Sequence, residues 1–202
     1  GRGARFRQAG YDTPKPFLPV DGVPMVVRAA GCLPEPRRAI FIGLHEHMTA
    51  SRVLERYFPG AHFIFLQDVT EGQAITCEIA IKAARVGDDN PILISACDNA
   101  AVYDQTKFSD LIHDPSVDVI VWSFTNHPTG KINPNMYSWL DVDDKGFIRG
   151  VACKQFIEGC KHAIIGTMYF RKAKYFLDGL KANQERGITT NGEYYVDQVI
   201  NR

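Results

Sequence analysis

The sequence has no net charge, no paired cysteine motif and no long apolar run, and each lack excludes a class of protein. Its 202 residues carry 23 Lys and Arg against 23 Asp and Glu, so no overall field draws the chain to nucleic acid or to an anionic membrane. The five cysteines form no C-x-x-C pair, which argues against a disulfide framework or a structural zinc site. No apolar run reaches the ~18–20 residues that span a bilayer, and no secretory leader is recognisable. We therefore expect a cytoplasmic protein without a nucleic-acid or membrane partner.

What is present is the composition of a core-forming protein and a regular alternation of elements. Hydrophobic residues make up 45% of the chain and charged residues 23%, which favours a single domain over residues 1–202. Apolar runs typical of strands alternate with helical periodicity. The expected helices are 23–31, 46–57, 71–85 and 105–113, and the expected strands are 39–43, 62–66, 91–96 and 117–124. This order predicts a three-layer α/β/α, Rossmann-like fold with a mixed, mostly parallel central sheet, whose ligands bind at the carboxyl ends of the strands.

The later part of the chain changes character. Residues 136–142 and 147–153 flank a turn at 143–146 and predict a β-hairpin, followed by a strand over 163–170 and a helix over 173–185. A last helical pattern, 194–202, ends in mid-period. The first residues of the chain are also typical of a turn, and no predicted strand precedes them. We expect a short strand upstream of residue 1 and further chain beyond residue 202.

The opening segment concentrates glycine and positive charge. Gly1 and Gly3 allow backbone N–H groups to approach an anion. Four basic side chains surround them, those of Arg2, Arg5, Arg7 and Lys15. Together they predict a phosphate-binding loop, although a flexible basic N-terminus has the same composition. The dinucleotide fingerprint fails because Phe6 stands at its third glycine position.

Asp98 is the most distinctive single acid. It follows the apolar run 91–96 and so stands at the carboxyl end of a predicted strand, where an oxygen ligand can hold Mg²⁺ against a triphosphate. The alternative is that Asp98 caps the next turn together with Asn99. The tandem D-x-D signal of glycosyltransferases is absent, because Ala100 follows Asn99.

Residues 1–25 carry G-x-G-x-R followed by P-K-P-x-x-x-V-x-G-x-P-M, and this segment resembles the start of the nucleotidyltransferases that make nucleotide sugars and related activated alcohols. The resemblance implies a nucleotide-diphospho-sugar transferase fold. It implies that the loop with Gly1, Gly3 and Arg5 wraps the triphosphate and that Lys15 contacts phosphate oxygens. Asp98 matches the family's metal-binding aspartate, so the resemblance implies Mg²⁺ as cofactor. In many members a second metal-binding aspartate comes later, which here would lie beyond Arg202.

Base recognition is expected at residues 66–74. The amide of Gln67 can donate and accept hydrogen bonds, which suits a pyrimidine edge, and Gly72 permits close approach of a base to the backbone. The family uses a glutamine and a glycine in this region. The alternative is a capping box, with Thr70 at the N-cap and Gln73 at the third helical position.

The phosphorylated acceptor is expected to bind to the later half of the chain. Lys154 lies where the family has E-K-P, with Cys153 and Gln155 replacing the acid and the proline, so the resemblance implies that Lys154 holds the acceptor's phosphate. A solvated lysine is the alternative. The segments that resemble the family's acceptor pocket contain Tyr137, Ser138, Gly166 and Thr167.

The segment 191–197 resembles the G-E-[YF]-Y segment of capsule-type and phosphocholine-type members. Glu193 and Asp197 are expected on one face of the final helix, near a cationic or hydroxylated substrate or a second metal. The alternative is an ordinary interaction of acids with the helix dipole.

The resemblance thus implies a Mg²⁺-dependent enzyme that transfers a nucleoside monophosphate from a nucleoside triphosphate, preferably a pyrimidine, to a sugar 1-phosphate or similar phosphorylated alcohol. Pyrophosphate is released, and the product is expected to serve surface polysaccharide synthesis. The expected catalytic residues are Arg5, Lys15, Asp98 and Lys154. The alternatives are a glycosyltransferase of the same fold and a non-catalytic nucleotide-binding regulatory domain. A homo-oligomer is compatible with the sequence.

Overall fold

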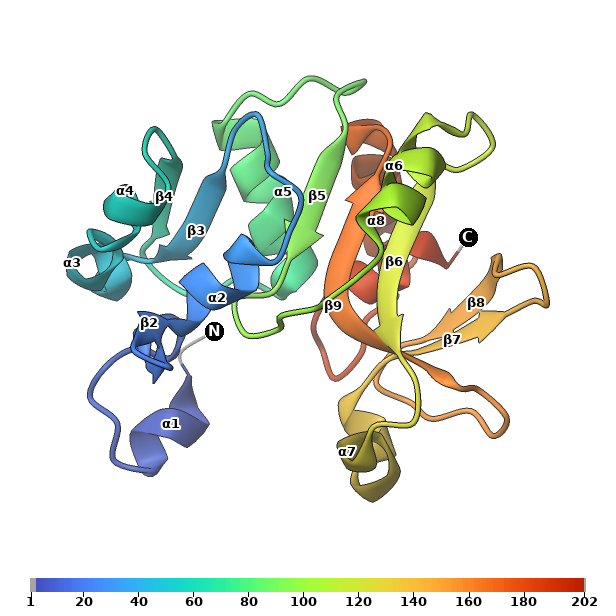
Figure 1. The fold of residues 1–202 in the computed structure, drawn as a ribbon, viewed down its shortest axis with the longest axis horizontal. Coiled ribbons are helices and arrows are strands. Elements are labelled where there is room, and N and C mark those ends of the chain that lie inside the picture. Colours follow the sequence, from blue (N-terminus) through green and yellow to red (C-terminus); the bar gives the residue numbers. More distant parts are fainter. Residues whose placement is uncertain (1–2, 202) are drawn as a thin grey trace.

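The computed structural model describes residues 3–201 and arranges them as a mixed α/β protein with two main groups of strands (Figure 1). The first group is a two-stranded parallel sheet, in which β3 (Ile40–Leu44) pairs with β4 (His62–Leu66). The second is a five-stranded sheet. Its members are β5 (Ile92–Ser95), β6 (Val119–Phe124), β7 (Trp139–Val142), β8 (Ile148–Ala152) and β9 (His162–Phe170).

The long strand β9 organises the five-stranded sheet. It pairs antiparallel with β5, β6 and β7, and β7 continues antiparallel into β8. Because β5 and β6 both run opposite to β9, they run parallel to each other. The expected mixed sheet is confirmed, but within residues 3–201 only β3 and β4 form a parallel ladder. The parallel neighbours expected from the alternating pattern are separated because β9, which comes later in the chain, inserts between them.

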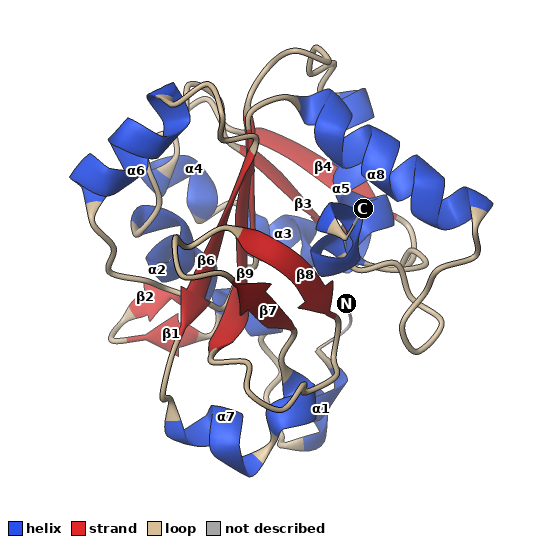
Figure 2. Ribbon diagram, turned by 90° about the vertical axis from the view of Figure 1, so that its right-hand side faces the viewer, coloured by secondary structure: helices blue, strands red, loops and turns tan. Residues whose placement is uncertain are grey.

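Helices cover both faces of the strands (Figure 2). On one side lie α5 (Gln73–Ala83) and α8 (Ala173–Glu185), and on the other lie α2 (Met25–Gly31), α4 (Leu54–Tyr57) and α6 (Gln105–His113). The main core lies between β9 and α8, where Phe170 and Phe176 make an edge-to-face contact. The three layers expected from the sequence are therefore present.

Several predicted elements match closely. The helices predicted at 105–113 and 173–185 and the strand at 62–66 have the bounds found for α6, α8 and β4. In α8 the buried Ala173, Phe176 and Leu180 recur at helical spacing and face the core. The hairpin of β7 and β8 is also confirmed, with its turn closed by Asp143 and Phe147.

Other predicted helices are wrong. Residues 46–57 form a short 3₁₀ turn (η2, His45–His47), α3 (Met48–Ser51) and α4, because hydrogen bonds of the tighter i→i+3 type interrupt the helix around Arg52 and Val53. The predicted last helix is only the 3₁₀ segment η4 (Val196–Ile200). The remaining short elements are α1 (Ala4–Gln8), η1 (Lys15–Phe17), β1 (Pro19–Val20), β2 (Val23–Pro24), α7 (Pro128–Ile132) and η3 (Pro134–Met136). Within residues 3–201, no helix combines the length and apolar character needed to cross a bilayer.

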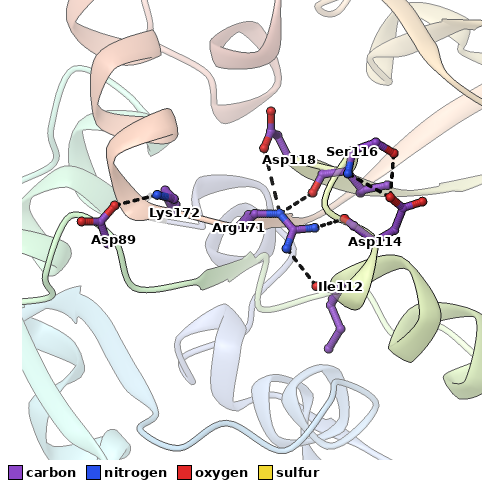
Figure 3. Close-up of polar contacts among 8 residues, drawn as sticks. Asp89, Ile112, Asp114, Ser116, Asp118, Arg171 and Lys172 are labelled. Carbon is purple, nitrogen blue, oxygen red and sulfur yellow. Dashed lines mark hydrogen bonds and ion pairs between the residues drawn. The ribbon is translucent and has the colours of Figure 1, made fainter.

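Arg171 ties the end of β9 to the connection between α6 and β6 (Figure 3). Its Nε donates to the carbonyl of Val117 at 2.6 Å and a terminal nitrogen donates to that of Ile112 at 3.1 Å. The other terminal nitrogen donates to the carbonyl of Asp114. One guanidinium thus satisfies three backbone acceptors where α6 ends, which fixes the connection against the sheet.

Candidate functional site

One cluster of predicted site residues lies where α1, η1 and β5 meet. Lys15 Nζ contacts the carboxylate of Asp98 just beyond β5, although the two residues are 83 positions apart. Both side chains remain partly open, with 28% and 31% of their surface exposed. Gly3 has a φ of 62°, and a Cβ at this position would lie 3.3 Å from Lys15 Cβ. The structure therefore brings Gly3, Lys15 and Asp98 together; Gly1 lies outside the described residues.

Two neighbours fix the position of Asp98. The amide of Asn99 donates to Asp98 Oδ1 at 3.4 Å. Gly166 in β9 has a φ of 82°, and a Cβ there would lie 3.3 Å from Ala96 Cβ and 3.7 Å from the Asn99 amide. The loop that carries Asp98 thus packs against β9 at a residue without a side chain. Gly166, expected to contact the acceptor, lies beside Asp98 in this arrangement.

The surroundings of Asp98 fit a magnesium ion that arrives with a nucleotide. Within residues 3–201, no three His, Cys, Asp or Glu side chains gather as a metal site. Mg²⁺ is commonly held by one or two carboxylates together with substrate phosphates and water. A single, partly exposed carboxylate beside a lysine matches that pattern. It does not match a self-contained protein metal centre.

A second cluster surrounds Lys154. The hydroxyl of Ser138 accepts the Lys154 backbone N–H at 3.2 Å and donates to the carboxylate of Asp197. Lys154 Nζ donates to the carbonyl of Met136 at 2.6 Å and lies 5.6 Å from the ring centre of Tyr195. This second cluster therefore combines one ammonium group with a buried carboxylate.

Burial dominates the titration of the groups around Lys154. Burial raises the pKa of Asp197, against the opposing effects of Ser138 and Lys154. Burial and then the nearby charge of Glu193 raise the pKa of Tyr195 to about 12. Burial likewise raises the pKa of Cys153. The Cys153 thiol is therefore protonated at neutral pH and is a poor nucleophile.

The two clusters are anchored on the same strand. The N–H of Ile164 in β9 donates to the carbonyl of Ser138 at 2.8 Å, and the carbonyl of Gly166 accepts the N–H of Ala96 at 3.0 Å. Residues two apart in a strand are separated by about 7 Å. The segments that carry Ser138 and Asp98 are therefore bonded to residues of β9 that lie two positions apart.

The two residues expected to read the base differ in their exposure. Gln67 is exposed just beyond β4. Gly72 is buried with a φ of 135°, and a Cβ there would lie 2.4 Å from the carbonyl oxygen of Tyr194. The close approach that this glycine allows is therefore made to the Tyr194 backbone. The alternative of a capping box at Thr70 is wrong, because its hydroxyl donates to the Gly72 carbonyl and the helix begins at Gln73.

Two hydroxyl residues expected to touch the acceptor instead support the site. Ser138 and Thr167 are each 1% exposed. Thr167 Oγ1 bonds Ser95 Oγ at 3.0 Å, which links β9 to β5. Tyr137 is less buried, and its hydroxyl lies 2.8 Å from Thr129 Oγ1. Ser138 and Thr167 are thus closed to solvent and bonded to other groups of the protein.

Arg5 and Glu193 are exposed. Arg5 lies in α1, in a segment where a loop was expected. Glu193 precedes η4 and bonds to Thr190 through backbone groups on both sides. The prediction that Glu193 and Asp197 share a helix face is wrong, because Tyr194 between them is bonded to the start of α5 and cannot begin a helix. The sequence did not indicate the contact of Asp197 with Ser138, since 59 residues separate them.

Comparison with known proteins shows similarity at the level of the fold. No family model and no curated protein matches the sequence. A nucleoside-diphosphate-sugar pyrophosphorylase from Vibrio cholerae is 18% identical, with a TM-score of 0.75 over 98% of this chain and 82% of that one. The inositol-1-phosphate CTP transferase from T. maritima is 14% identical, with a TM-score of 0.74 over 100% and 76%. A UDP-glucose pyrophosphorylase complexed with UDP-glucose is 14% identical, with a TM-score of 0.69 over 100% and 82%. The chain has the fold of these proteins.

Proposed function

We propose that this chain is a nucleotidyltransferase that moves a nucleoside monophosphate from a nucleoside triphosphate to a phosphorylated small molecule. The observation that carries the proposal is the meeting of Lys15 and Asp98 beside Gly3. A cation and a backbone loop can bind phosphate oxygens, and a carboxylate at the end of a strand can bind the metal ion that accompanies a triphosphate. Fold neighbours named as a pyrophosphorylase and a CTP transferase support the same reaction class.

In the proposed reaction a phosphate oxygen of the acceptor attacks the α-phosphorus of the triphosphate. One P–O bond forms, the bond to the β-phosphate breaks, and pyrophosphate leaves. The acceptor phosphate is already ionised at neutral pH, so no side chain has to remove a proton. The work of the protein is to align two anions and offset their charge. Lys15 and Arg5 serve the triphosphate in this scheme, and Lys154 serves the acceptor phosphate.

A magnesium ion bound to Asp98 would supply further neutralisation of the triphosphate charge. Lys15 faces the same carboxylate. Its ammonium group has three donors, so it can bind a phosphate oxygen while it stays close to Asp98. Asp98 is thus the residue of this chain on which metal dependence should rest.

The finer parts of the proposal concern the substrates and their setting. A pyrimidine donor rests on the amide of Gln67, and a sugar 1-phosphate acceptor rests on Lys154 and the fold neighbours. A role in surface polysaccharide synthesis, a cytoplasmic location and a homo-oligomeric state stay predictions.

The test is pyrophosphate release from ATP, GTP, CTP, UTP and dTTP, each with Mg²⁺ and with glucose 1-phosphate or inositol 1-phosphate. We expect turnover with a pyrimidine triphosphate that is lost in Asp98→Ala and Lys15→Ala. Asp89→Ala is the matched control, because Asp89 forms an aspartate–lysine pair with Lys172 at 2.9 Å outside the site. Activity that survives Asp98→Ala would contradict the assignment. Consumption of a nucleotide sugar without pyrophosphate would indicate a glycosyltransferase instead.

A further inference from the structure

Lys154 adopts a backbone conformation that residues with a side chain rarely adopt. Its φ is 52°, in the left-handed region, and a residue with a Cβ pays a penalty there. Such a conformation persists when surrounding contacts impose it. The lysine stands two residues beyond the end of β8 at Ala152, and its backbone conformation contributes to the direction in which its side chain leaves the turn.

The hydroxyl of Ser138 contacts the backbone of Lys154 in this conformation. A serine hydroxyl has one proton and two lone pairs. Since the proton is donated to Asp197, the lone pairs are available to accept the Lys154 N–H at 3.2 Å. Asp197 therefore acts on Lys154 through Ser138, by fixing the rotation of the hydroxyl.

The arrangement is closed to solvent. Ser138 is 1% exposed and Asp197 8% exposed, so water cannot readily replace either partner. The other end of Lys154 is also constrained, because Nζ donates to the Met136 carbonyl and lies over the Tyr195 ring. Two of its three ammonium donors remain for an anion. Contacts thus constrain both the backbone and the ammonium group of Lys154.

We infer that Ser138 and Asp197 are positioning residues, which hold the left-handed backbone of Lys154 and thereby direct its ammonium group at the acceptor's phosphate. The inference rests on the proposed function, in which Lys154 binds that phosphate. It assigns to Asp197 a role in substrate binding although its carboxylate is buried and touches no substrate. It also explains why a carboxylate is buried here beside a hydroxyl rather than replaced by an apolar side chain.

The experiment uses the whole chain and four variants. Ser138→Ala removes the relay, Asp197→Leu removes the acceptor for the hydroxyl, and Asp197→Asn keeps an oxygen that accepts it. Ser51→Ala is the matched control, since its buried hydroxyl donates to the Met48 carbonyl at 2.7 Å in α3. Each protein is assayed for the affinity of glucose 1-phosphate, followed through the amide resonance of Lys154. Hydrogen exchange of that amide and the KM values of acceptor and triphosphate are measured as well.

We expect Ser138→Ala and Asp197→Leu to weaken glucose 1-phosphate binding and raise the acceptor KM about tenfold, in line with one lost buried hydrogen bond. Amide exchange at Lys154 should accelerate in the same two variants. Asp197→Asn should retain most of the affinity, Ser51→Ala all of it, and the KM for triphosphate should not move. Unchanged acceptor affinity in folded Ser138→Ala protein or in folded Asp197→Leu protein, or equal losses for donor and acceptor, would overturn the inference. Absence of pyrophosphate release in wild type would instead overturn the proposed function, while the binding titration would still report on the relay.

Discussion

Replacing Gly72 by alanine tests whether this glycine serves the fold rather than the base. The added Cβ would lie 2.4 Å from the oxygen, 2.5 Å from the nitrogen and 2.9 Å from the carbonyl carbon of Tyr194. The φ of 135° adds backbone strain of about 1–3 kcal/mol. Overpacking against backbone atoms adds about 1–3 kcal/mol. We therefore expect Gly72→Ala to lower the free energy of unfolding by about 2–6 kcal/mol, the sum of the two.

Gly60→Ala separates the two contributions. Gly60 has a φ of 79°, but a Cβ there would meet no heavy atom within 4 Å, so only the backbone strain applies. Urea unfolding of wild type and both variants measures the difference, and thermal unfolding should show it as a fall of about 2–4 °C per kcal/mol for a chain of this size. If Gly72→Ala were as stable as Gly60→Ala, the packing of Gly72 against Tyr194 would be refuted. If Gly72→Ala were stable and raised only the KM for triphosphate, the base-contact reading would stand instead.

Three further predictions concern Asp98, Arg171 and Asp197. Asp98→Asn should lower kcat by about 100-fold or more, because charge stabilisation is lost. Its free energy of unfolding should change by only about 0–1 kcal/mol, because the ion pair with Lys15 is partly exposed. If kcat and the free energy of unfolding, measured by urea unfolding, both fell sharply, Asp98 would have a purely structural role. Arg171→Lys should cost about 2 kcal/mol in urea unfolding, since a lysine cannot satisfy the three carbonyls, whereas Arg149→Lys on the exposed Asp141 pair should cost almost nothing. Burial raises the pKa of Asp197 above its ordinary 3.8, so the folded state binds the proton more tightly than the unfolded state. Wild type should therefore lose stability relative to Asp197→Asn as pH rises from about 3.8 through the raised pKa; a difference that is flat with pH would show that the carboxyl is not perturbed.

The local hydrophobic pattern of the sequence was sufficient to predict part of the fold. The helix 173–185 was predicted from its apolar spacing and is present as α8. Such a prediction is possible because the apolar face of a helix is formed by residues three or four positions apart in the sequence. The position of β9 between β5 and β6 was not predicted, because the order of strands depends on pairings between distant segments. The same limit applies to helix 46–57, where tertiary packing and i→i+3 bonds outweigh the amphipathic pattern.

The candidate site shows the same division. Lys15 and Asp98 were expected together because of a family resemblance and because Asp98 follows an apolar strand. Their contact is present. The link from Asp197 through Ser138 to Lys154 had no signal in the sequence, which drew attention to Asp197 beside Glu193 but not to its contact with Ser138, 59 residues away. The partner of Gly72 was also hidden, because a sequence indicates that a glycine is present but not which backbone approaches it.

Both clusters are attached to β9 through backbone hydrogen bonds. Ile164 is bonded to the segment that carries Ser138, and Gly166 to the segment that carries Asp98. One residue separates these two anchors, so the chain limits how far apart the two bonded segments can lie. Each of the two clusters is thus tied to the same part of one strand. Substitutions in the surrounding loops should leave the spacing of the two segments unchanged, whereas insertion or deletion of a residue between 164 and 166 should change that spacing and abolish the proposed transfer.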